Sequence, residues 1–434
     1  MRTRLPASER TSQRIRELRE RIGEGDGIGE LMRLGIRELV EKALEEEVED
    51  ALGRGYYARG EAERRGYRNG HRTGRIATAE GEVEFSVPQV RDTAEPFESR
   101  VRAELPKRTE ALEDLAVEMY ARGLSTRDIE ATFCDARGRS LLSRTAVSKL
   151  TERLWAEYEA FATRDLSEHE IVYLFADGIC ERLHAGERKE PVLCAWGICR
   201  DGQKVLLALT PGTKEDTESC RSFFQDLKRR GLRDPLLVAT DGGAGLIRAA
   251  DECFPRAVRQ RCLAHRMRNL QAKVPESAWP EFKVRALACY QGPSPEVARM
   301  LRTDLVSHYE RELPTAVACF VDDFDACIAQ LRFPISHRRS IRTTNLLERL
   351  FGEERRRMKI VANAFGERPV LKLMYASLIR GSERWRGLRN GPFEAKQLDT
   401  LRTELDDTHR RQVAPATTRS DEVSPSRISS KKGT

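Results

Sequence analysis

No apolar run in this 434-residue sequence approaches the roughly 20 residues that a membrane-spanning helix needs. The first 30 residues are charged throughout and lack the apolar stretch and small-residue cleavage site of a signal peptide. The ten cysteines form no CxxC pair and no dense framework, which suits a reducing compartment. These absences argue against membrane and secreted proteins and predict a soluble, cytoplasmic one.

Charge, in contrast, is abundant. Asp, Glu, Lys and Arg make up 33% of the residues, and the formal net charge is +7. Because this total is only mildly basic, local clusters of positive charge matter more than the sum. One such cluster lies between Arg54 and Arg75, where arginines alternate with glycine, Asn69 and tyrosines. A solvated surface loop and an arm that follows a DNA backbone both explain this composition.

A helix and a strand flank this basic segment. Residues 28–52 place apolar side chains at helical spacing on one side and acidic ones on the other, which predicts an amphipathic helix and a possible interface between protomers. Alternating apolar residues between positions 83 and 87 predict a half-buried strand, which we expect Pro88 to end.

Three helical segments follow, and their pattern suggests DNA recognition. A glycine at position 123 separates the first two, and the third begins at Ser143 with a basic, hydroxyl-rich first turn. This pattern predicts a helix-turn-helix, although a plain three-helix bundle explains it as well. Residues 156–170 show no clear period and are expected to form a linker. The candidate DNA-contacting residues are Arg144, Thr145, Ser148 and Lys149.

From residue 171 the pattern becomes α/β. Runs that are apolar on both faces predict buried strands, and an Asp-Gly turn predicts a hairpin. Beyond Asp406 the chain has hardly any large apolar residue, so we expect a disordered tail. The expected strands are 171–178, two strands within 191–212, 235–242 and 257–262.

Two of these strands end alike, in Ala-Asp-Gly at 176–178 and Thr-Asp-Gly at 240–242. Either motif alone is explained by a strand-ending turn. On adjacent strands, however, they would bring two carboxylates together, which is costly unless a divalent cation lies between them. Oxygen ligands favour Mg²⁺ or Mn²⁺. Gly242 and Gly243 would then leave space for a metal and a DNA backbone.

A predicted helix at 343–359 offers a third carboxylate, Glu348, on the same side as Gly352. Alone, this helix is equally explained as a surface element with solvated charges. Beside the two Asp-Gly motifs, its basic residues become candidate phosphate ligands. They are Arg355, Arg356, Arg357 and Lys359.

These motifs resemble those of the mutator-type transposases of bacterial insertion sequences. The resemblance runs from about residue 30 to 400 and rests on "YLFADGICERL", "VATDGGAGLIRAADECFPRAVRQRCLAHRMRNL" and "TTNLLERLFGEERRRMKIVANAF", in family order. The middle block is the most specific, because Cys262 and His265 match the C-x2-H signature of the family. "GYRNGHRTGRIATAEGEVEFSVPQVRD" resembles its amino-terminal segment. Departures such as Ala176, where Leu is usual, touch no presumed ligand.

The resemblance implies an α/β, RNase H-like catalytic core, a mixed sheet flanked by helices, with a helical insertion. It implies a triad of Asp177, Asp241 and Glu348 that binds two Mg²⁺ or Mn²⁺ ions. The expected activity is cleavage at terminal inverted repeats and strand transfer into target DNA, by a homodimer or larger assembly associated with the nucleoid.

Several alternatives stay open from the sequence. Cys262 and His265 could bind zinc, although no second ligand pair is visible, or could serve in core packing and in DNA positioning. A catalytically inactive DNA-binding protein and a purely hydrolytic RNase H-like nuclease are the rival functions.

We expect seven segments along the chain. They are a flexible N-terminus (1–27), the helix with the basic arm and β segment (28–100), the mostly helical DNA-binding region (101–165), the first part of the core (166–262), the helical insertion (263–340), the second part of the core (341–405) and the tail (406–434).

Overall fold

The computed structural model describes the chain with eight internal gaps and two omitted ends. The described residues are 5–21, 27–58, 66–134, 138–181, 189–212, 216–346, 351–352, 355–356 and 366–413. They fall into two compact units. The first unit is Met1–Ala160 with Gly352–Ser377, and the second is Phe161–Phe351 with Leu378–Thr434.

The first unit begins with two packed helices, α1 (Ala7–Arg21) and α2 (Gly27–Leu52). One stripe of α1 is buried, and the Thr11 hydroxyl donates to the buried Glu41 carboxylate of α2 over 2.6 Å. The expected flexible N-terminus is therefore wrong for residues 7–21. The buried stripe of α1 is narrow, since most of its residues are charged or polar, and it becomes recognisable only beside α2.

Strands β1 (Tyr67–Thr78) and β2 (Gly81–Arg91) form an antiparallel hairpin that packs against α2. Pro88 does not end β2 as expected. It pairs with His71 beside a register shift between Arg68 and His71, and a bulge is a place where a strand tolerates the missing N–H of proline. The basic segment is thus a strand from Tyr67 onward, and residues 59–65 lie outside the described residues.

Short helices complete the first unit around a shared core that includes Leu112, Val147 and Leu373. The tight turn at Gly123, with φ of 97°, lies between the second and third of these helices. The expected linker is helical as far as Thr163, because Tyr158 and Phe161 are buried. The helices are α3 (Arg100–Glu104), α4 (Glu110–Ala121), α5 (Thr126–Thr132), α6 (Arg144–Leu150), α7 (Glu152–Thr163) and α17 (Glu367–Ser382), of which α7 and α17 continue into the second unit.

The second unit is built on a mixed five-stranded sheet in the order β5-β4-β3-β6-β7. The first three strands in sequence are antiparallel neighbours, whereas β6 and β7 run parallel to β3. The expected strands are confirmed, with small shifts of their ends. They are β3 (Ile171–Glu181), β4 (Glu190–Cys199), β5 (Lys204–Pro211), β6 (Leu237–Thr240) and β7 (Val258–Arg261).

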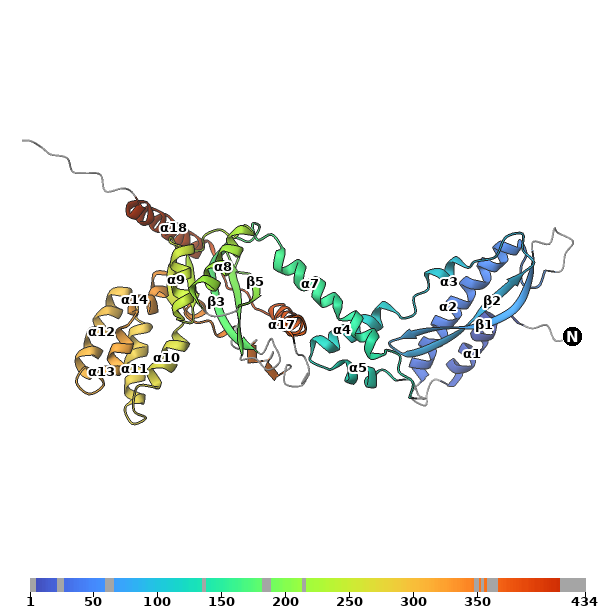
Figure 1. The fold of residues 1–434 in the computed structure, drawn as a ribbon, viewed down its shortest axis with the longest axis horizontal. Coiled ribbons are helices and arrows are strands. Elements are labelled where there is room, and N and C mark those ends of the chain that lie inside the picture. Colours follow the sequence, from blue (N-terminus) through green and yellow to red (C-terminus); the bar gives the residue numbers. More distant parts are fainter. Residues whose placement is uncertain are drawn as a thin grey trace, which may run out of the picture. The chain divides into compact units, whose positions relative to one another are not determined.

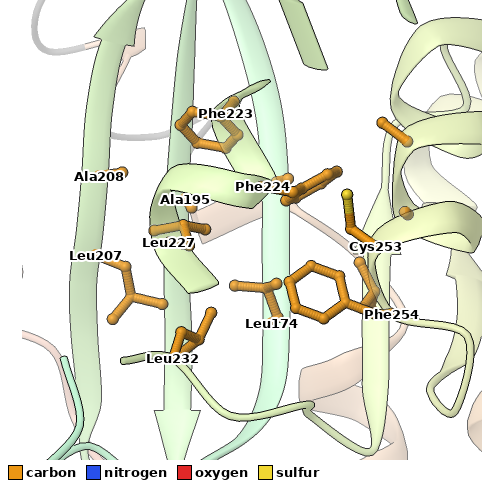
Figure 2. Close-up of a cluster of buried hydrophobic side chains, with 14 of the residues drawn as sticks. Leu174, Ala195, Leu207, Ala208, Phe223, Phe224, Leu227, Leu232, Cys253 and Phe254 are labelled. Atoms are coloured by element: carbon orange, nitrogen blue, oxygen red, sulfur yellow. The ribbon is translucent and has the colours of Figure 1, made fainter. Parts of the chain in front are cut away.

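One face of the sheet is covered by α8 (Thr217–Arg229) and α9 (Ala244–Cys253) (Figure 1). Figure 2 shows Phe224 of α8 and Phe254, just after α9, packed against Leu174 of β3. These apolar contacts exclude water from one side of the sheet. The residues that follow the strand ends are thereby held on a rigid frame.

A group of helices after β7 has an apolar core of its own, which includes Phe282, Tyr290 and Phe320 (Figure 1). This group matches the helical pattern read from the sequence. Its elements are α10 (Leu263–Gln271), α11 (Trp279–Tyr290), α12 (Pro295–Tyr309), α13 (Pro314–Val321), α14 (Phe324–Cys327), a 3₁₀ turn at Ala329–Arg332 and α15 (Ile335–Ile341).

The expected disordered tail is helical in its first part. Helix α18 runs over Pro392–Val413, and Asp406, where disorder was expected to begin, lies 3.6 Å from the Arg256 guanidinium. Residues 414–434 lie outside the described residues. Among the helices that the structure describes, none is both long and apolar enough to cross a membrane. No disulfide joins the ten cysteines, all of which are described.

Candidate active site

The two Asp-Gly motifs lie side by side in the sheet. Ala176 of β3 pairs with Thr240 of the parallel strand β6, so Asp177 and Asp241 each follow directly after this pair. β6 ends there, but β3 continues and pairs with β4. The sequence had suggested that Asp177 lies at the end of its strand. In the structure it lies within the strand.

Strand alternation places the Asp177 side chain on the sheet face away from α8 and α9. Tyr173 and Phe175 share this face, because side chains two residues apart point the same way. Phe175 stacks on Trp196 with ring centroids 3.9 Å apart, and Trp196 contacts Trp385. Asp177 thus follows a layer of stacked aromatic side chains that pack against β3 on this face.

Burial and charge both act on Asp177, which is only 4% exposed. Burial raises the pKa of Asp177 to about 7, and the nearby charge of Asp241 contributes in the same direction. His265 and a hydrogen bond from the Thr344 side chain act in the opposite direction on this pKa. The Asp241 carboxylate is therefore close enough to disfavour the charged form of Asp177.

Backbone hydrogen bonds fix both carboxylates. The Gly178 N–H donates to Asp177 Oδ1 over 3.0 Å, and the Gly243 N–H donates to Asp241 Oδ1 over 2.9 Å. Asp177 also takes part in the hydrogen bond with the Thr344 side chain. A hard divalent cation fits this pair, because it takes oxygen ligands and relieves the repulsion that raises the pKa of Asp177.

The C-x2-H motif lies at the same place. Cys262 directly follows β7, and its N–H donates to the Thr240 carbonyl over 2.8 Å. Its Sγ accepts from the Thr344 N–H at 3.3 Å and from the Thr344 hydroxyl at 3.4 Å. Burial raises the pKa of the Cys262 thiol, but hydrogen bonds from His265 and Thr344 outweigh burial and leave it below its ordinary value.

The space beside Gly242 is filled by Arg261. Gly242 has a φ of 102°, and a Cβ built there would lie 2.5 Å from Arg261 Nε. The expectation that Gly242 leaves room for a metal and DNA is therefore wrong, since this glycine accommodates a guanidinium from β7. Arg261 in turn lies 3.3 Å from the Asp322 carboxylate and 3.5 Å from that of Asp323.

The sequence is similar to that of a known protein family. A family model described as "Transposase, Mutator family" matches residues 7–387. This chain belongs to the Mutator family of transposases.

Named relatives of this Mutator-family chain are transposases of insertion sequences. It is 32% identical over 275 residues, 63% of its length, to the transposase for IS6120 of Mycolicibacterium smegmatis, of which it covers 85%. It is 31% identical over 367 residues, 83% of its length, to the transposase for ISRM5 of Rhizobium meliloti, of which it covers 89%. With the transposase for IS256 in transposon Tn4001 of Staphylococcus aureus it shares 29% identity over 326 residues, 74% of its length and 83% of the relative.

The third expected carboxylate of this Mutator-family protein, Glu348, lies outside the described residues, as do Arg357 and Lys359. Arg355 and Arg356 are described, helical and exposed, and they belong to the first compact unit. The roles assigned to these five residues stay predictions.

The four candidate DNA-contacting residues of α6 are all exposed. Ser143 caps this helix by accepting from the Ala146 N–H. Arg144 forms an ion pair with Glu130 at 3.1 Å. The exposed residues are Arg144, Thr145, Ser148 and Lys149.

Within the described ranges, no group of three or more His, Cys, Asp and Glu side chains is arranged to hold a metal ion. A zinc site at Cys262 and His265 thus has no third ligand among these residues. Thr344 and Arg261 are the two residues near the carboxylates that sequence reasoning missed. The only sequence signal for Thr344 is its place four residues before Glu348.

Proposed function

We propose that this Mutator-family protein is a DDE transposase with an RNase H-like core, which cuts the ends of its own insertion sequence and joins them to target DNA. The observation that carries the proposal is the pair of neighbouring carboxylates, the buried Asp177 and the half-buried Asp241, that follow paired residues of adjacent parallel strands. The sheet, antiparallel on one side of β3 and parallel on the other, supports the RNase H-like assignment.

Asp177 and Asp241, together with Glu348, would hold two Mg²⁺ or Mn²⁺ ions. Bound ions would supply positive charge to activate the attacking oxygen and stabilise the leaving oxygen of the phosphodiester. The chain itself fixes the carboxylates, through the Gly178 and Gly243 amides and the Thr344 hydroxyl. Because Asp177 is buried, its ionised form is costly until positive charge arrives.

The same site would serve two successive reactions. In the first, water attacks a phosphodiester at the transposon end and frees a 3′-hydroxyl. In the second, this 3′-hydroxyl attacks a phosphodiester of another strand, so that one P–O bond forms as another breaks. Neither reaction needs a covalent bond between DNA and protein.

The first compact unit would bind the terminal inverted repeats, with α6 as the element that contacts DNA. Its first turn exposes cationic and hydroxyl side chains that suit phosphate and base contacts. Two transposon ends require at least two protomers, and α2 exposes Ile28, Met32 and Leu39. The protein would act on cytoplasmic DNA, at the nucleoid.

A strand-transfer assay tests this function against its rivals. A labelled oligonucleotide with the cognate end, a plasmid target and Mg²⁺ should give both cut and joined products. Cutting without joining would indicate a purely hydrolytic nuclease, and binding without cutting an inactive DNA-binding protein.

The Asp241→Asn variant tests the role of the carboxylate pair in the same assay. It should lose cutting and joining and keep end binding, because only the negative charge is removed. Asp251→Asn is the matched control, since Asp251 is exposed on α9. Retained cleavage by Asp241→Asn would contradict the assignment.

A further inference from the structure

The thiol of Cys262 lies at a junction of three chain segments. Cys262 is fully buried, and its N–H donates to the carbonyl of Thr240 at the end of β6. The next residue, Leu263, donates its N–H to the Arg342 carbonyl over 3.0 Å. Through its sulfur, Cys262 also accepts from the Thr344 backbone and hydroxyl. The dipeptide Cys262-Leu263, which follows β7, is thus hydrogen-bonded both to the end of β6 and to residues 342–344.

Two of the segments that this dipeptide contacts, β6 and residues 342–344, precede a carboxylate of the proposed triad. Thr240 directly precedes Asp241, and Thr344 stands four residues before Glu348. The Thr344 hydroxyl has a single hydrogen, which the Asp177 side chain shares with Cys262 Sγ. Thr344, which is itself fully buried, therefore touches both Cys262 and the third carboxylate-bearing segment, β3.

We propose that Cys262 and Thr344 are positioning residues, which form a latch that sets the spacing of the carboxylate-bearing segments for metal binding. This inference rests on the proposed function. The thiol acts as a hydrogen-bond acceptor, and Thr344 transmits its position to Asp177. Groups that orient metal ligands in this way commonly change metal affinity tenfold to a hundredfold when they are removed.

Two other roles for Cys262 fit the geometry less well. A nucleophile must reach its substrate, whereas Cys262 has no exposed surface. A zinc ligand needs companions, and the part of the chain with described coordinates offers no set of three suitable side chains. The sulfur is also already occupied by the two donors of Thr344.

Metal-dependent stabilisation of the full-length protein tests the latch. The unfolding temperature is measured in EDTA and then against Mn²⁺ or Mg²⁺ concentration, for the wild type and for Cys262→Ala, Thr344→Val and Thr344→Ser. We expect Cys262→Ala and Thr344→Val to need about tenfold more metal for the same stabilisation. Thr344→Ser keeps the hydroxyl and should stay near the wild type.

Cys289→Ala is the matched control, because Cys289 is equally buried but lies in the helical core after β7. Cys289→Ala should lower the unfolding temperature in EDTA, because it leaves a cavity. It should leave unchanged the metal midpoint, which is the metal concentration that gives half of the full stabilisation. The double variant Cys262→Ala/Thr344→Val should need little more metal than Thr344→Val alone, since Thr344→Val already removes the hydroxyl through which Cys262 acts on Asp177. If Cys262→Ala does not fold, Thr344→Val carries the test, because it keeps the size of the side chain.

The outcomes separate the latch from the proposed function. A wild-type metal midpoint in both Cys262→Ala and Thr344→Val would overturn the latch. One equivalent of zinc in the purified wild type, lost in Cys262→Ala, would overturn it as well. A wild type that neither Mn²⁺ nor Mg²⁺ stabilises would instead overturn the proposed metal-dependent function.

Discussion

At the residue scale, Asp177 links the buried site to stability. Its pKa of about 7 in the folded protein lies above the value of about 3.9 expected in the unfolded chain. The folded state therefore binds the extra proton between these pH values, and stability falls as pH rises from about 4 to 7. Above both pKa values, this loss is complete and reaches at most about 4 kcal/mol.

The pH dependence of unfolding in EDTA measures this loss. We expect Asp177→Asn to become more stable than the wild type as pH rises toward 7, because the amide carries no charge to bury. Added Mg²⁺ should reduce the difference in stability between Asp177→Asn and the wild type, because it stabilises only the wild type. Parallel pH profiles for the two proteins would show that Asp177 ionises without penalty.

Glycine substitutions test the packing of Arg261 on the Asp241 turn. Gly242→Ala should lower stability by about 1 to 3 kcal/mol, since its φ is 102° and the new methyl group would meet Arg261. Gly35→Ala is the control, because Gly35 is inside α2 with nothing within 4 Å of a built Cβ. It should raise stability by about 0.5 to 1 kcal/mol. Chemical denaturation measures the stability of both variants. Equal changes in stability would contradict the close approach of Arg261 to Gly242.

At the element scale, the exposed first turn of α6 makes a prediction about salt. Lys149→Ala should weaken binding to the transposon end and reduce the slope of log affinity against log salt by about 1, because one phosphate contact is lost. Lys396→Ala on α18 is the control for a general loss of positive charge. An unchanged slope of log affinity against log salt in Lys149→Ala would show that Lys149 of α6 makes no phosphate contact.

Elements were predictable where the signal is local. The strands around Asp177 and Asp241 are apolar on both faces, so the sequence located them closely, although β3 continues past the Asp-Gly motif that was expected to end it. Helix α1, the continuation of β2 past Pro88 and the helical residues 406–413 were missed, because each depends on a partner elsewhere in the chain. Thr344 and Arg261 were missed for the same reason.

At the scale of the whole molecule, the chain is folded from segments that are far apart in sequence. Leu373 and Ala376 of α17 join the core of α4, α5 and α6, and Lys372 pairs with Glu152 at 2.8 Å. The chain therefore returns to its first compact unit after completing most of the second. No helix was predicted at 367–382, and the core that α17 joins depends on residues far away in the sequence.

Asp177, Asp241 and Glu348 are proposed to act together on DNA, and a substitution of Glu348 tests this role most directly. Strand transfer by Glu348→Gln should be measured beside Glu354→Gln, a carboxylate of the same sequence segment. We predict that Glu348→Gln binds the transposon end but neither cuts nor joins it, whereas Glu354→Gln does both. Cutting and joining by Glu348→Gln at the wild-type rate would contradict the account.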